Sequence, residues 1–224
     1  MTLTLHASGV AKRFGGAEFV LHDVDLTVAP GLLTVVRGEA AAGKSTLVRC
    51  LAGAYRLNAG SVRLYGDGEE LILGEADPRT VAWLRREHLG LVDGRLVAAP
   101  RESAQEAAAR SLEHAGATPE RARRRAAELL ERIGLAALAT TPVGLLPAHA
   151  RRAIAVGRSL LSPTAVLLLD EPTHGLPDRA GEHLVGLMDH ARRTGTAVLA
   201  TARQRDSIET LADHILDLDH GVLR

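Results

Sequence analysis

One nine-residue stretch constrains this chain more than any other part of it. It reads Gly38-Glu39-Ala40-Ala41-Ala42-Gly43-Lys44-Ser45-Thr46 and fits the pattern G-x-x-x-x-G-K-[ST]. The apolar run Leu32–Val36 predicts a buried strand before it, and residues 46–52 predict a helix after it. Backbone N–H groups at such a helix start form a concavity for anions. We therefore predict that all nine residues hold a nucleotide, with Lys44 on its β- and γ-phosphates and the Ser45 hydroxyl on Mg²⁺.

A second motif supplies the acidic groups that this chemistry needs. The apolar run Ala165–Leu169 has the length of a buried strand and ends abruptly in Asp170-Glu171-Pro172-Thr173. A carboxylate at the end of a strand can complete the magnesium site, and we assign this role to Asp170. The adjacent Glu171 can orient or deprotonate an attacking water, which makes it the candidate catalytic residue. The alternative, a core strand followed by a solvated acidic turn, is disfavoured by the matching loop upstream.

Composition narrows the class of partner. Lys and Arg total 27 and Asp and Glu total 27, and aromatic residues make up 2% of the 224 residues. This balance and the scarcity of stacking side chains weigh against a nucleic-acid partner. The single cysteine allows no internal disulfide, and no apolar run reaches the roughly 20 residues that span a bilayer. No secretory signal is evident, so we expect a cytoplasmic protein that meets a membrane only through partner subunits.

The order of patterns predicts an α/β fold: a P-loop NTPase core with an antiparallel β subdomain and a helical insertion. We expect one domain over residues 1–224, with the core in 1–94 and 162–224 and the helical subdomain in 95–161. Short strands are predicted at Leu3–Ala7, Val10–Phe14, Val20–Leu21, Leu26–Val28, Leu32–Arg37, Ser61–Leu64, Leu71–Leu73, Ala197–Thr201 and Ile215–Leu218. Helices are predicted at Glu102–His114, Glu120–Ile133, Asp178–Arg193 and Ser207–Ala212.

This order of parts resembles the ATP-binding subunits of ABC systems over essentially the whole chain. The segment Val10-Ala11-Lys12-Arg13-Phe14 lies where that family places an aromatic residue on adenine, so the resemblance implies that Phe14 stacks on the base. The stretches Leu21–Val28 and Leu51–Gly53 are also similar to the family's sequences around the phosphate loop. The resemblance implies ATP and Mg²⁺ as cofactors and a second ATP-binding subunit, the same or different, as partner.

A narrower resemblance is to the L subunit of the bacterial phosphonate carbon–phosphorus lyase system. It rests on the segments Asp67–Leu71, Ala76–Arg79, Leu84–Arg86, Leu89–Val92 and Ala99–Arg101. Lipoprotein-release and cell-division ATP-binding subunits share some of these features. The further partner is thus either a membrane permease or a carbon–phosphorus lyase complex.

Four positions that complete hydrolysis in the family carry other residues here. Gly94 occupies the place of the Gln that touches Mg²⁺ and water, and Leu146-Pro147-Ala148-His149-Ala150 replaces the Leu-Ser-Gly-Gly-Glu/Gln signature. His174-Gly175-Leu176-Pro177 replaces a loop that ends in Asp, and Arg203 falls at the position of the switch His. Pro147 has no N–H to donate, and the side chains after it obstruct close backbone approach.

The phosphate loop and the acids predict Mg-ATP binding, and these losses predict that hydrolysis is slow or depends on a partner. The chain would act in phosphonate metabolism or in a membrane transporter. Two alternatives stay open: a non-catalytic scaffold gated by nucleotide, and an ordinary ABC transporter motor. Compensation is a further hypothesis, in which Arg203 donates to the γ-phosphate and Asp93 holds a magnesium-bound water. The alternative is that Arg203 and Asp93 are ordinary surface charges without a role in hydrolysis. Ala41, where most relatives have Gly, is expected to destabilise the loop slightly if its φ must be positive.

Overall fold

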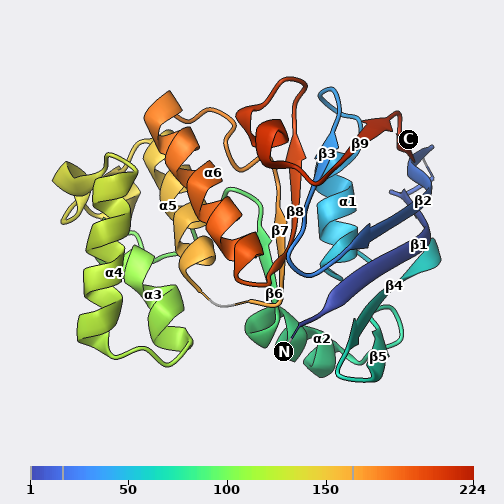
Figure 1. The fold of residues 1–224 in the computed structure, drawn as a ribbon, viewed down its shortest axis with the longest axis horizontal. Coiled ribbons are helices and arrows are strands. Elements are labelled where there is room, and N and C mark those ends of the chain that lie inside the picture. Colours follow the sequence, from blue (N-terminus) through green and yellow to red (C-terminus); the bar gives the residue numbers. More distant parts are fainter. Residues whose placement is uncertain (1, 17, 163) are drawn as a thin grey trace. The chain divides into compact units, whose positions relative to one another are not determined.

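A computed structural model describes residues 2–16, 18–162 and 164–224, and these form two compact units (Figure 1). The first unit takes in Met1–Leu91, Thr164–Glu171 and Ala191–Arg224, and the second takes in Val92–Pro163 and Pro172–His190. The α/β fold expected from the sequence, with an antiparallel sheet and a helical part, is confirmed by the two sheets and the helices described below. The predicted limits of the helical subdomain, 95–161, stay a prediction.

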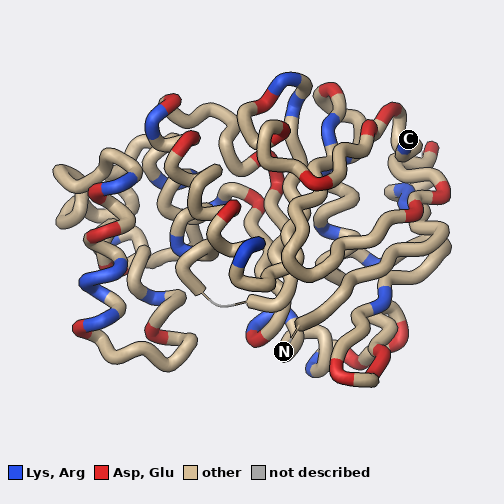
Figure 2. Tube along the Cα trace, in the orientation of Figure 1, with Lys and Arg blue, Asp and Glu red and all other residues tan. Residues whose placement is uncertain are grey.

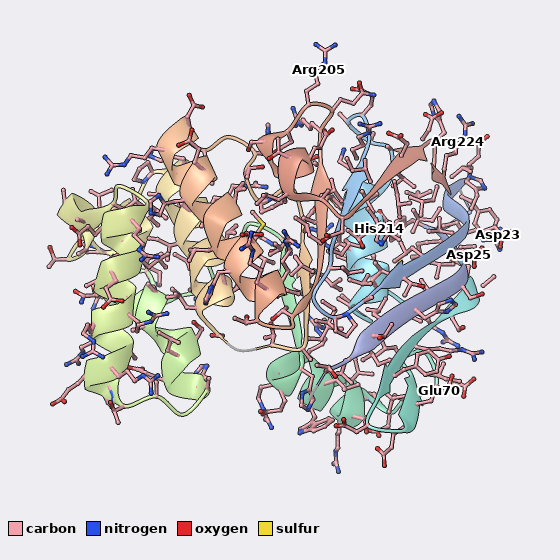
Figure 3. The ribbon with its side chains drawn as sticks, viewed as in Figure 1. Asp23, Asp25, Glu70, Arg205, His214 and Arg224 are labelled. Atoms are coloured by element: carbon pink, nitrogen blue, oxygen red, sulfur yellow. The ribbon has the colours of Figure 1, made fainter. Side chains whose placement is uncertain are left out.

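An antiparallel sheet of the first unit has the strand order β2-β1-β4-β5. Its strands are β1 (Thr4–Arg13), β2 (Phe19–Val28), β4 (Ala59–Gly66) and β5 (Glu69–Ile72). The prediction that β1 and β2 would each be two shorter strands was wrong. Gly9 has a φ of 61° and its N–H donates to Oδ1 of Asp25 at 2.9 Å, so β1 passes through a bulge without ending. Figure 3 labels Asp25 and Asp23 on β2.

The second sheet of this unit has the order β10-β9-β3-β8-β7-β6. Its strands are β3 (Leu33–Arg37), β6 (Leu89–Val92), β7 (Val166–Leu169), β8 (Ala197–Ala202), β9 (His214–Asp219) and β10 (Val222–Leu223). β3 pairs in parallel with β8 and β9, and β7 pairs in parallel with β8. The carboxyl ends of β3, β7 and β8 therefore meet at one edge, as in other open parallel sheets, where ligands bind.

Burial explains why these three strands read as continuous apolar runs. Every residue of β7 and β8 is buried, as are four of the five residues of β3. Thr34 and Thr201 are the two polar residues of these strands that are buried. Asp217 on the neighbouring β9 accepts a 2.6 Å hydrogen bond from Nε of Arg37, which holds the pKa of that carboxyl below its ordinary value.

Short helical segments complete the first unit. Helix α1 (Lys44–Leu51) follows the phosphate loop, and α2 (Pro78–Glu87) begins where the Asp77 carboxylate accepts the N–H of Arg79 and Thr80. The predicted helix at residues 207–212 is a 3₁₀ segment, η3 (Ser207–Leu211), so that prediction was wrong in type. A capping box fixes its start, but one short turn offers too few i→i+4 bonds for an α-helix.

The second unit is helical. It contains α3 (Ala104–His114), α4 (Pro119–Arg132), η1 (Ala136–Leu138), η2 (Val143–Leu145), α5 (Ala148–Leu161) and most of α6 (Asp178–Arg193). Leu129 and Leu130 lie on the buried, apolar face of α4. Leu129 packs so closely on α5 that a Cβ at Gly157 would lie 2.8 Å from it. Both blue and red segments lie along α4 in Figure 2, as is typical of a solvated helix face.

Among the described residues, no helix combines the length and the apolar character that crossing a membrane requires.

Candidate nucleotide site

The loop between β3 and α1 has the backbone geometry that a phosphate cradle needs. A Cβ on Gly38 would lie 2.4 Å from the carbonyl oxygen of Leu218, and a Cβ on Gly43 would lie 2.9 Å from that of Val20. Gly43 also has a φ of 107°, a backbone angle that residues with a side chain rarely adopt. Both glycines of the motif are thus required by close backbone contacts on either side of the loop.

Ala41 adopts a φ of 67°, so the condition attached to its mild cost is met. A left-handed conformation costs a residue with a Cβ about 1 kcal/mol relative to glycine. The loop adopts this left-handed conformation although the residue at position 41 is alanine and not glycine.

Lys44 is buried, and its ammonium group is fully engaged. Its Nζ donates to the carbonyl oxygens of Gly38 at 2.7 Å and of Glu39 at 2.8 Å, and lies 3.1 Å from Oε1 of Glu171. Two hydrogen bonds and one ion pair thus surround an ammonium group that has three N–H groups to donate. The lysine therefore ties the phosphate loop to the acidic motif at the end of β7.

The two acids follow β7 and share one partner on β8. Asp170 is buried and its Oδ1 accepts a hydrogen bond from Oγ1 of Thr201 at 3.0 Å. The N–H of Glu171 donates to that same oxygen, Oγ1 of Thr201, at 2.9 Å. Glu171 has a φ of 44°, a conformation that few residues with a side chain adopt.

Arg203 reaches the other side of the Glu171 carboxylate. Its Nε lies 3.5 Å from Oε2 of Glu171, and its side chain is 54% exposed, so this ion pair is weak. Arg205, two residues farther along, projects into solvent in Figure 3. The predicted contact of Arg203 with a γ-phosphate stays a prediction, but the structure brings the guanidinium to the catalytic candidate.

A cavity of about 290 Å³ opens over the phosphate loop. Its lining is Val20, Ala41, Gly43, Lys44, Ser45, Thr46 and Glu171. Phe14 does not line it. That ring lies edge-on to Tyr55 at 5.4 Å between centroids, with Nζ of Lys12 4.8 Å from its centre. The assignment of Phe14 to adenine stays a prediction.

Three of the four altered positions line one cavity of about 680 Å³ in the second unit. Gly94, Ala148, His149, His174 and Gly175 all contribute to it. Pro147 precedes α5, and no side chain caps the start of that helix. Gly94 has a φ of 75°, and a Cβ there would lie 3.0 Å from the Arg152 guanidinium, so the backbone disfavours a glutamine at this position.

Asp93 is paired within the same unit. Its Oδ2 accepts from Nε of Arg95 at 2.9 Å. The proposed role of Asp93 on a magnesium-bound water stays a prediction. Among the described residues, no group of three His, Cys, Asp or Glu side chains is arranged to hold a metal ion.

Comparison with known proteins decides the family. A sequence profile described as "ABC transporter" matches residues 21–174. The chain belongs to the ABC transporter family. It is 32% identical over 223 residues to the macrolide export ATP-binding/permease protein MacB of Rhodopseudomonas palustris strain HaA2, which covers 98% of this chain and 33% of the relative. It is 30% identical to the methionine import ATP-binding protein MetN of Brucella abortus strain 2308, over 95% of this chain and 56% of that protein.

The same fold is present in solved structures of this family. A bacterial ABC transporter cassette, MJ0796, described as dimeric, superposes with a TM-score of 0.84 at 22% identity, over 98% of this chain and 96% of that chain. The ABC cassette fold predicted from the sequence is confirmed by this likeness. The chain spans about a third of the length of the macrolide exporters that it matches.

Domains of the ABC family bind ATP with Mg²⁺, and the residues of this chain fit both. The cavity over the loop is lined by residues 43–46 at the start of α1, where backbone N–H groups can bind an anion. The Ser45 hydroxyl and the Asp170 carboxylate are hard oxygen ligands of the kind that Mg²⁺ prefers. Lys44 contributes the positive charge for phosphate oxygens.

Sequence reasoning missed one residue of this site and one contact. Thr201 is hydrogen-bonded to both acids, but the sequence assigns it only to the end of a predicted strand. The signal was present, because Thr201 is a lone hydroxyl in the otherwise apolar run of β8. The contact between Lys44 and Glu171 could not be read from sequence, since it joins residues that are far apart along the chain.

Proposed function

We propose that this chain is the ATP-binding, ATP-hydrolysing motor domain of a membrane transporter. The observation that carries the proposal is the 3.1 Å contact between Lys44 of the phosphate loop and Glu171. The family membership supports it, as do the names of the relatives, which are an exporter joined to a permease and a methionine importer. The relatives named here give no support to the narrower resemblance to the carbon–phosphorus lyase L subunit, so a transporter is the better proposal.

Each residue of the site has a part in this activity. Lys44 and the loop N–H groups bind the phosphates, and Ser45 and Asp170 hold the metal ion. Mg²⁺, when bound, neutralises charge on the phosphate oxygens. Glu171 orients a water and takes its proton at a carboxylate oxygen. A second ATP-binding subunit and a permease are the partners, and the chain works in the cytoplasm, at the membrane face where the permease holds it.

Hydrolysis by this chain is proposed to be slow. The signature stretch lacks the serine and glycines that donate hydrogen bonds in relatives, and Pro147 has no N–H to offer. Gly94 cannot position a water as a glutamine does. Turnover of several per second, within the ordinary enzyme range, by the isolated chain would contradict this part of the proposal.

Glu171→Gln tests the function itself. We expect phosphate release to fall by about a hundredfold or more, because a positioned general base contributes 10²–10⁴-fold. Glu131→Gln, an exposed position on α4, is the matched control and should leave turnover unchanged. Equal, measurable turnover in wild type and E171Q would exclude Glu171 as the base. ATP binding without turnover in either protein would favour a nucleotide-gated scaffold.

A further inference from the structure

The hydroxyl of Thr201 joins the two acids of the site. It is fully buried at the end of β8, one strand away from the acids that follow β7. Its oxygen accepts the N–H of Glu171 at 2.9 Å and is 3.0 Å from Oδ1 of Asp170. A hydroxyl has one hydrogen to donate, and the N–H can only donate. The hydroxyl hydrogen is therefore directed at the Asp170 carboxylate.

This arrangement fixes backbone as well as side chain. Glu171 has a φ of 44°, and residues in such conformations persist only where their surroundings hold them. The bond from the Glu171 N–H to Thr201 is a local restraint of that kind. Further restraints act on the side chain, where Lys44 and Arg203 lie beside the two carboxylate oxygens.

We propose that Thr201 is a positioning residue, whose hydroxyl aims Asp170 at the metal ion and sets the backbone turn that presents Glu171. This inference rests on the proposed Mg-ATP site. Thr201 touches neither phosphate nor metal in this role and acts only through the two acids. Its removal should therefore weaken what Asp170 contributes and leave the phosphate loop intact.

The contrast between two threonines provides a controlled experiment. Thr201→Val removes the hydroxyl and keeps the shape, whereas Thr201→Ser keeps the hydroxyl. Thr34 is equally buried on the adjacent β3, and its hydroxyl has no hydrogen-bond partner among the described residues. Thr34→Val is thus a matched change that deletes a buried hydroxyl without deleting a bond to an acid.

The readout is binding of the non-hydrolysable analogue AMP-PNP, measured by calorimetry in EDTA and again in Mg²⁺. Affinity in EDTA reports the loop, and the gain in Mg²⁺ reports the acids. For T201V we expect less than a twofold change in EDTA and a loss of about tenfold in the Mg²⁺-dependent gain, the size of one or two buried hydrogen bonds. T201S and T34V should each stay within twofold of wild type. If T201V does not fold, Thr201→Ala removes the same hydroxyl with less bulk.

Two outcomes would overturn the inference. T201V could keep the full Mg²⁺-dependent gain, or it could lose affinity equally in EDTA and Mg²⁺, as a general defect in folding would cause. A wild-type protein that binds AMP-PNP under neither condition would instead overturn the proposed function, so the two failures are distinguishable.

Discussion

Glu171 competes with phosphate for Lys44. The two side chains are 4% and 18% exposed, and Nζ lies 3.1 Å from Oε1. At that separation and an effective dielectric constant of 20, the attraction is about 5 kcal/mol before the solvation of both ions is subtracted. Hydrogen bonds to charged groups retain roughly 1.5 kcal/mol of net stabilisation after that subtraction. A phosphate that binds Lys44 must therefore compete with the ion pair to Glu171.

Glu171→Gln should therefore bind AMP-PNP more tightly than wild type in EDTA, by about tenfold, since roughly 1.4 kcal/mol corresponds to that factor. The analogue is not hydrolysed, so trapping of substrate cannot produce the gain. Fluorescence or calorimetric titration measures it directly. Glu131→Gln, which removes the same charge at an exposed position on α4, is the control, and its affinity should change less than twofold.

Equal or weaker affinity of E171Q in EDTA would refute the reasoning. It would mean that Lys44 binds phosphate without leaving the carboxylate, or that the ion pair has no net strength. A gain of similar size in E131Q would point instead to a general loss of negative charge, and not to the specific contact with Lys44.

Three further predictions concern other parts of the molecule. Ala41→Gly should raise the free energy of unfolding by about 0.5–1 kcal/mol, because φ is 67°; no change in urea denaturation would contradict this. Burial raises the pKa of the Cys50 thiol to about 11, so it should resist iodoacetamide at pH 8 until the protein unfolds. Arg37 lowers the pKa of Asp217, so the stability from this pair is present above the ordinary carboxyl pKa and is lost as pH falls through the lowered pKa. In Asp217→Asn the free energy of unfolding, measured by urea titration, should therefore fall less steeply as the solution is made acidic.

Local patterns were sufficient where a segment's conformation depends on its own residues. The bounds of α6 were predicted to the residue, and those of α4 to within one, because a long amphipathic period with a proline or glycine at its ends is unambiguous. The short strands before residue 30 were harder. Bulges at Gly9 and Asp23 look like breaks in sequence, although pairing with the neighbouring strand carries the chain through them.

The sequence by itself determined the chemistry of the phosphate loop and of the acids that follow β7, because G-x-x-x-x-G-K-S and an apolar run ending in Asp-Glu each encode a local shape. Only the tertiary structure decided how they meet. The parallel pairing of β3, β7 and β8 brings Lys44, Glu171 and Thr201 together. A hydrogen bond between residues 30 positions apart, or an ion pair between residues more than 100 apart, leaves no periodic signal in a single sequence.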